Sequence, residues 1–222
     1  MPEDQKSIGQ SPLLSDADSV YAKIMNDIAD GVFVSGDRLV TTQLAKRYDT
    51  SINPIREALK QLQGEGFVSI SPNSGASVAK FEFETMRNVF EILQLLDPYL
   101  LQYFVETHTA SQLAETQAIQ NKLELMSDEE LLEFRYWDTE FHWSIYKHHY
   151  NKQAIDLWKR NRLILHAMHV NLPINLVRIK QSIAEHQELL TAIISRDSTQ
   201  ALNVLRAHIS GSGSFWSRHY RF

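Results

Sequence analysis

Four side chains, far apart in the sequence, are of the types that bind a divalent metal ion. Asp138 and His142 stand four residues apart, so on a helix their Cβ atoms would lie about 5–6 Å apart on one face. His186, preceded by Glu185, and His208 follow in later segments. One carboxylate and three imidazoles suit the first shell of Zn²⁺, Ni²⁺ or Mn²⁺. Spacing alone nevertheless favours the plainer interpretation of solvated or core-capping histidines, because the chain contains nine histidines.

A second set of polar and basic side chains lies in the first half of the chain. Ser51 is a good N-cap and Pro54 is tolerated in the first turn of a helix. On that helix Asn53 and Arg56 lie three residues apart. Asn pairs with adenine, and Arg pairs with guanine or a phosphate. Each residue taken alone also fits a cap or a solvated face, but the order and lengths together indicate a helix that enters a DNA groove.

The overall composition excludes several classes of protein. The 222 residues include 43% hydrophobic residues and no cysteine, which excludes disulfides, thiolate metal sites and cysteine nucleophiles and fits a reducing cytoplasm. We expect no membrane span, since no apolar run is long enough, and a disordered leader over 1–16. The net charge of −5 argues weakly against DNA binding. From Arg38 to Lys60, however, the sequence contains five basic residues and two acidic residues. This local excess of positive charge can steer DNA.

The pattern over 17–80 predicts short helices followed by a hairpin. Asp18 or Ser19 can cap a first helix, and Thr41 can cap a second. The third helix begins after Ser51. Two short apolar runs around the turn Ser-Pro-Asn-Ser-Gly then form a two-stranded hairpin. Three small helices and a hairpin are the plan of a winged helix-turn-helix.

Residues 83–212 show apolar positions at helical spacing and no strand pattern. We predict an all-helical antiparallel bundle. Its helices are expected at 83–106, 110–126, 128–149, 151–170, 174–195 and 197–210. Residues 213–222 are interpreted as a tail that starts with a Gly/Ser link. The predicted fold class is therefore mainly α, with an N-terminal winged helix-turn-helix followed by this bundle.

The first half resembles the DNA-binding domain of GntR-type bacterial transcription regulators. The family pattern appears as Gly31…Ser35-Gly36…Leu39, Leu44-Ala45, Ser51-Ile52-Asn53-Pro54-Ile55-Arg56-Glu57-Ala58-Leu59 and Leu62…Gly66-Phe67-Val68. The resemblance implies an operator in double-stranded DNA and a homodimer that reads two half-sites. The residues that we expect at the DNA are Thr42, Thr50, Ser51, Asn53, Arg56, Lys60, Asn73, Ser74 and Gly75.

The second half is similar to the FCD-type ligand-binding domain of the FadR subfamily of these regulators. Two segments carry the resemblance: DTEFHWSIYKHHYNKQAIDLW and IAEHQELLTAIISRDSTQALNVLRAHI. In that family an Asp and three His bind a divalent metal inside the bundle. By position these are Asp138, His142, His186 and His208. The resemblance also implies a small-molecule effector, typically an organic acid, bound near the metal.

Two departures from the family patterns affect these expectations. Ile52 and Thr42 occupy places where the family usually has cations, so we expect weaker or differently specified DNA binding. Leu93 replaces an Arg that often meets an acidic effector, and Asp97 stands at the later acidic position. The side chains that can substitute for that Arg are Arg135, Arg162, His166 and His169.

Three functions remain open from the sequence. The first is a cytoplasmic, effector-responsive transcription regulator without enzymatic activity. The second is a metal-dependent hydrolytic enzyme, although no second carboxylate, nucleophile elbow, Walker loop or H-E-x-x-H motif is present. The third is a protein-interaction module whose DNA-binding domain has degenerated, as Ile52 and Thr42 would allow.

Overall fold

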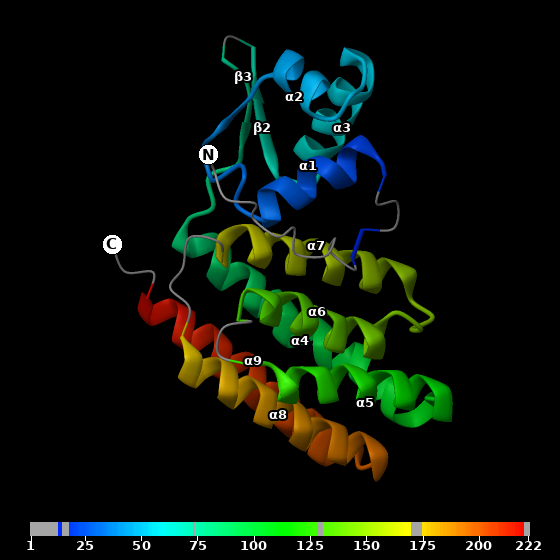
Figure 1. The fold of residues 1–222 in the computed structure, drawn as a ribbon. Coiled ribbons are helices and arrows are strands. Elements are labelled where there is room, and N and C mark those ends of the chain that lie inside the picture. Colours follow the sequence, from blue (N-terminus) through cyan, green and yellow to red (C-terminus); the bar gives the residue numbers. More distant parts are fainter. Residues whose placement is uncertain (1–12, 15–17, 73, 128–130, 170–174, 220–222) are drawn as a thin grey trace. The chain divides into compact units, whose positions relative to one another are not determined.

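The chain divides into two compact units. The computed structural model describes residues 13–14, 18–72, 74–127, 131–169 and 175–219 (Figure 1). The first unit comprises Met1–Glu82 with Leu163–Leu172, and the second comprises Phe83–Arg162 with Pro173–Phe222. The expected leader, residues 1–16, lies almost entirely outside the described residues.

In its described residues the first unit contains three short helices ahead of a hairpin, as predicted. The helices are α1 (Val20–Ala29), α2 (Thr41–Arg47) and α3 (Ile52–Gly64), and the strands are β1 (Arg38–Leu39), β2 (Val68–Ser71) and β3 (Gly75–Val78). The strands form one antiparallel sheet in the order β1-β3-β2. The sheet thus has one strand more than the predicted hairpin. Strand β1 was not predicted, because two residues are too few to show the alternation typical of a strand.

The starts of the helices show which expected caps are used. Ser19 is the N-cap of α1 and its side chain accepts a hydrogen bond from the Ala22 amide. The expectation that Thr41 caps α2 was wrong: the helix begins at Thr41, and Val40 is the N-cap without a side-chain hydrogen bond. The reason is that β1 ends at Leu39, so a single residue links strand and helix. Ser51 is the N-cap of α3, but its side chain makes no capping hydrogen bond.

Buried apolar side chains from the helices and the hairpin form the core of the first unit. Its buried members include Ile24, Ile28, Leu44, Ile55, Leu59, Leu62, Phe67 and Val78. In α3 the positions Ile55, Ala58, Leu59 and Leu62 are buried. Because these positions recur at helical spacing, the opposite face of α3 is left to solvent.

The second unit is built from long helices, as predicted. They are α4 (Phe83–Thr107), α5 (Ala110–Leu125), α6 (Leu131–Tyr146), α7 (Lys152–His169), α8 (Leu176–Ile194) and α9 (Ser198–His219). Helix α7 contributes its last turns, from Leu163, to the first unit. The fold class is therefore confirmed as a winged helix-turn-helix followed by a helical bundle. None of the described helices is both long enough and apolar enough to cross a membrane.

The C-terminal segment differs from the prediction. Residues 213–219, interpreted from the sequence as part of a tail outside the bundle helices, continue α9 as far as His219. Two tertiary contacts explain why glycine and serine are helical here despite their low helix propensity. Arg178 donates to the Ser212 hydroxyl at 3.0 Å, and a Cβ on Gly213 would lie 3.3 Å from the Phe90 ring. Glycine therefore lets α9 approach Phe90 of α4 closely.

Candidate metal centre and nucleic-acid interface

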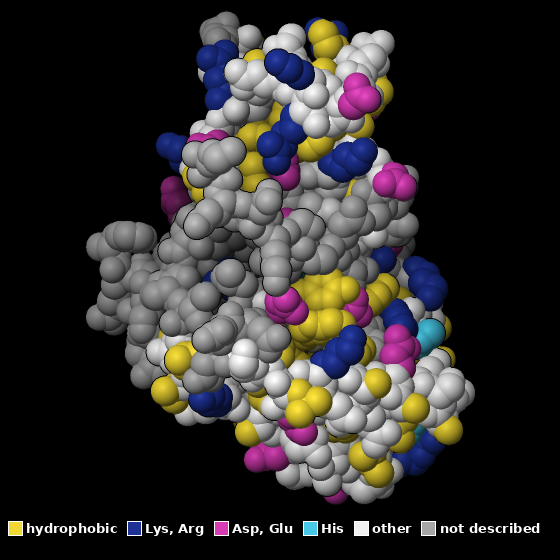
Figure 2. Space-filling model, viewed as in Figure 1, with side chains coloured by type: hydrophobic (Ala, Val, Ile, Leu, Met, Phe, Trp, Pro, Cys, Tyr) yellow, Lys and Arg dark blue, Asp and Glu magenta, His cyan; other side chains and the backbone are white. Residues whose placement is uncertain are grey.

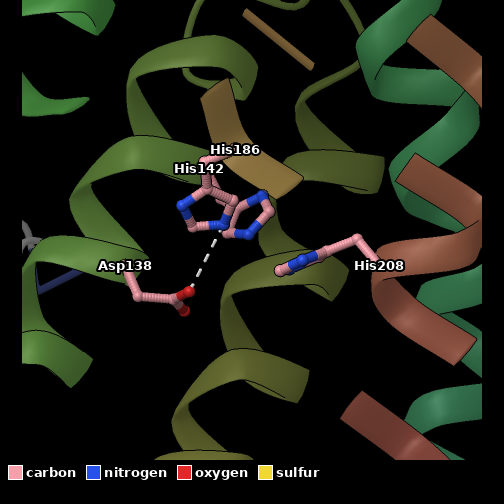
Figure 3. A group of neighbouring side chains, drawn as sticks. All are labelled: Asp138, His142, His186 and His208. Carbon is pink, nitrogen blue, oxygen red and sulfur yellow. Dashed lines mark ion pairs between the residues drawn. The ribbon is translucent and has the colours of Figure 1, made fainter. Parts of the chain in front are cut away.

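Three helices of the second unit bring the four expected metal-binding side chains together. Asp138 and His142 project from α6 one turn apart, His186 comes from α8 and His208 from α9. One ligand atom from each residue lies within 4.8 Å of the others. Figure 3 shows the four side chains pointing toward a common centre. Sequence spacing predicted only the pair on α6, because the meeting of three helices is a property of the tertiary fold.

Burial keeps His142 and His186 in the neutral form that binds metals. His142 and His186 have exposed fractions of 1% and 0%. Burial lowers the pKa of His186 to about 3 and lowers the pKa of His142 well below its ordinary value. Burial also opposes ionisation of Asp138, but the positive charge of Arg162 holds the pKa of Asp138 below its usual range. At neutral pH the cluster therefore offers imidazole lone pairs and a carboxylate.

The buried nitrogens of two histidines fit a divalent cation. Within the described part of the chain, neither ring nitrogen of His142 or His186 has a hydrogen-bond partner. The shortest approach recorded for His186 is 3.5 Å, from its Nε2 to Asp138 Oδ1 (Figure 3). A buried polar atom without a partner costs about 1–3 kcal/mol, and a bound cation would use these lone pairs. Three imidazoles and one carboxylate suit Zn²⁺, Ni²⁺ or Mn²⁺ better than Ca²⁺ or Mg²⁺, which prefer oxygen ligands.

Of the four expected effector-binding residues, Arg162 contacts the cluster directly. Its guanidinium forms an ion pair with Asp138 and donates to Thr139 Oγ1 at 3.2 Å. Arg135 is half-buried on α6, and burial lowers its pKa. His166 lies on the part of α7 that groups with the first unit. His169 ends α7, and its side chain lies outside the described residues.

Three buried polar side chains near Arg162 were not recognised in the sequence as a group. They are Asp97 on α4, Tyr146 on α6 and Trp158 on α7. Burial raises the pKa of Asp97 to about 7, although the Arg162 charge acts in the opposite direction. Asp97 Oδ1, Tyr146 Oη and Trp158 Nε1 have no hydrogen-bond partner among the described atoms. The only signal in the sequence was the acidic position of Asp97, since Tyr and Trp at helical spacing look like ordinary core residues.

The first unit presents most of the expected DNA-contacting residues on its surface. Ser51, Asn53, Arg56 and Lys60 are exposed on or beside α3. Thr42 and Ser74 are also exposed, whereas Thr50 is half-buried and Asn73 lies outside the described residues. Figure 2 shows several Lys and Arg side chains over the elements α2, α3 and the hairpin. This surface is therefore both basic and open, as a groove-binding surface must be.

Two details of this surface modify the prediction. Arg47, counted in the local basic excess, forms an ion pair with Asp27 at 2.5 Å, which reduces its availability to a phosphate. Arg38, missed as a contact residue, is exposed on β1, and one of its guanidinium nitrogens lies 3.9 Å from the position of a Cβ on Gly75. Arg38 therefore lies beside the wing. This position was not predicted, because β1 itself was not predicted.

Comparison with known proteins yields two family matches that together span most of the chain. Residues 88–211 match the FCD domain, and residues 16–78 match the bacterial regulatory proteins of the gntR family. The HTH-type transcriptional repressor GlaR of Escherichia coli (strain K12) is 28% identical over 85% of this chain and 90% of its own length. The HTH-type transcriptional regulator McbR of the same strain is 26% identical over 81% of this chain and 84% of its own.

Two solved structures share the fold. A structure titled E. coli McbR/YncC has a TM-score of 0.77 at 23% identity and covers 94% of this chain and 100% of its own. A putative transcriptional regulator GntR from Rhodococcus sp. RHA1 has a TM-score of 0.73 at 20% identity, covering 91% of this chain and 97% of its own. At these identities the similarity establishes only the arrangement of helices and strands. Function is therefore inferred from the individual residues.

Proposed function

The chain belongs to the gntR family of bacterial regulatory proteins and carries an FCD domain, and from this premise we propose that a metal-centred effector site in its helical domain controls its binding to operator DNA. The chain is a transcriptional regulator. We assign DNA binding to residues 17–80 and effector and metal binding to residues 83–212. The family matches over 16–78 and 88–211 support this division.

The observation that carries the proposal is the convergence of Asp138, His142, His186 and His208. Their ligand atoms approach within 4.8 Å in the interior of the second unit, where four ionisable side chains would otherwise be costly to bury. We propose that they bind Zn²⁺, Ni²⁺ or Mn²⁺. A metal held there would supply a positive charge to which a small anionic effector can bind.

We propose that Arg162 binds the acidic effector next to the metal. It occupies the interior next to Asp138, whereas Leu93 is a buried apolar residue at the place where the family often has an Arg. An organic acid would contact both the metal and Arg162. Asp97, Tyr146 and Trp158 offer further polar atoms without partners in the described structure, so an acid that also carries hydroxyl or carbonyl groups fits better than a simple carboxylate.

On the DNA side, we propose that α3 enters the major groove and that the hairpin rests on the adjacent backbone. The exposed face of α3 carries Asn53 and Arg56 near its N-terminus, the part of a recognition helix that reaches base edges. We infer that a cytoplasmic homodimer places two such helices on a near-palindromic operator. The effector changes operator affinity only if it prefers one arrangement of the DNA-binding domains over another.

The other two functions receive less support. The relatives reported above are named transcriptional regulators, which disfavours a hydrolytic enzyme. The match of residues 16–78 to the gntR family favours DNA binding over a purely protein-binding role.

The proposal is tested with one protein preparation and three measurements. Native mass spectrometry with elemental analysis would show the bound metal, and a thermal-shift screen of hydroxy and oxo acids would identify an effector. A ligand at 100 times its Kd stabilises the native state by about 2.7 kcal/mol. Fluorescence anisotropy on DNA from upstream of the protein's own gene would then show whether that acid changes affinity. Absence of sequence-specific binding in all conditions would refute the proposed function.

A further inference from the structure

Glu185 directly precedes His186 in the sequence. Its side chain contacts His208, although Glu185 is not one of the four expected metal ligands. Its Oε2 lies 2.6 Å from Nδ1 of His208. An ionised carboxylate only accepts hydrogen bonds, so Nδ1 of His208 must carry the proton in this contact. The other ring nitrogen, Nε2, is then left with its lone pair.

We propose that Glu185, held by Arg178, is a positioning residue of the metal centre that fixes His208 in the tautomer whose Nε2 binds the metal. The inference rests on the proposed metal centre and goes beyond its four ligands. A histidine ligand needs a neutral ring, a defined tautomer and a defined ring orientation. The contact with Glu185 supplies the second and third of these.

Arg178 holds the Glu185 carboxylate in a bidentate contact. Its Nη1 donates to Oε1 at 2.8 Å and its Nη2 donates to Oε2 at 2.6 Å. The side chains are 11% and 28% exposed. Nη2 also reaches the hydroxyl of Ser212 on α9 at 3.0 Å. Because such paired contacts restrict the carboxylate to one plane, Glu185 can orient His208 without swinging toward solvent.

The other two histidines lack an equivalent carboxylate in the described structure. The ring of His186 stacks on Phe141 with centroids 4.2 Å apart and planes 12° apart, so packing sets its orientation. Among the described residues, His142 has no hydrogen-bond partner on either ring nitrogen. His208 is therefore the ligand whose tautomer and ring orientation depend on an outer ion pair, and we expect metal affinity to depend on Glu185 and Arg178 through His208.

The test compares Zn²⁺ affinity and the His208 tautomer in the full-length protein. Glu185→Gln keeps the size of the side chain and removes its charge. Glu188→Gln, on the exposed face of the same helix, is the matched control. Loss of such an outer contact typically weakens metal binding about 10–100-fold. We expect this loss in Glu185→Gln, a smaller loss in Arg178→Gln, and an unchanged Kd in the control, all measured by competition with a chelating dye.

Nitrogen-15 NMR of the Zn²⁺-loaded protein distinguishes positioning from a general loss of stability. In wild type, the His208 proton should reside on Nδ1 and the metal on Nε2; in Glu185→Ala we expect the Nδ1 proton to lose its hydrogen-bonded, low-field shift. Wild-type Kd in Glu185→Gln, or a proton on Nε2 of His208 in wild type, would overturn the inference and leave the metal centre intact. A wild-type protein that binds none of the three metals would overturn both.

Discussion

Arg162 of α7 and Asp138 of α6 form an ion pair inside the second unit, each with a side chain only 14% exposed. Asp138 is at the same time one of the four converging metal-binding side chains. A single carboxylate therefore stands between a fixed guanidinium and the proposed cation. This arrangement means that the charge at the centre of the helical domain depends on Arg162 as well as on the metal.

Replacement of Arg162 by Met should destabilise the metal-free protein more than the metal-loaded protein. Removing one partner of a buried ion pair leaves the other charge uncompensated, which typically costs about 3–5 kcal/mol. A bound Zn²⁺ would compensate Asp138 in part. Urea unfolding of Arg162→Met with chelator and with Zn²⁺ checks this, with exposed Arg206→Met on α9 as the control. Equal losses in the two conditions would contradict a shared role for Asp138.

His186→Ala and His208→Ala should each lose the bound metal. Each removes one of three imidazole ligands, which leaves only two imidazoles and one carboxylate from the protein and weakens metal binding. Elemental analysis should show less metal than in wild type, and added Zn²⁺ or Ni²⁺ should no longer raise the Tm. His148→Ala changes an exposed histidine and serves as the control. Equal metal content in wild type and both variants would exclude the site.

Asp97→Asn should become increasingly stabilising, relative to wild type, as the pH rises. Burial raises the pKa of Asp97 in the folded protein to about 7 from an ordinary value of 3.8. The folded pKa is the higher one, so its contribution to stability is complete below about pH 4 and is lost as the pH rises through about 7. Asn does not titrate. The pH dependence contributed by all other groups is common to both proteins and cancels when their free energies of unfolding are subtracted.

The expected gain of Asp97→Asn between about pH 4 and pH 8 is on the order of 4 kcal/mol in the free energy of unfolding. Urea unfolding with chelator present measures it, and Asp156→Asn, exposed on α7, is the control. A difference between Asp97→Asn and wild type that does not change with pH would show that Asp97 does not titrate in this range.

The sequence predicted the local structure better than the convergence of distant residues. The i, i+4 pair Asp138 and His142 follows from helical spacing, but the approach of His208 was implied only by resemblance to a family. The contact of Glu185 with His208 has no local signal, because the two residues lie on different helices. Conversely, the helical end of α9 contradicted the local signal, because Gly213 packs against Phe90.

Arg56→Ala should weaken specific operator binding. Arg56 is exposed on the second turn of α3, and loss of an Arg that contacts a base typically costs about 1–3 kcal/mol, or about 5–150-fold in Kd. Fluorescence anisotropy on the wild-type operator measures the change. Exposed Arg206→Ala in the second unit controls for loss of net charge. Unchanged affinity in Arg56→Ala, with specific binding by wild type, would mean that α3 does not face the DNA as proposed.

Ile52→Arg should strengthen DNA binding and make it more sensitive to salt. Ile52 is the first residue of α3, and its side chain is 38% exposed, so a longer side chain can extend toward a phosphate without disturbing the core. One added phosphate contact should steepen the slope of log K against log salt by about 0.9. The cation at the helix N-terminus should cost only about 0.3–1 kcal/mol of stability.

Anisotropy titrations over a range of salt concentrations measure the slope, and Ile52→Gln separates added charge from added length. If Ile52→Arg and Ile52→Gln show the same slope as wild type, the N-terminus of α3 lies away from the phosphates. In that case the low number of cations on α3 would not limit the affinity of the protein for DNA.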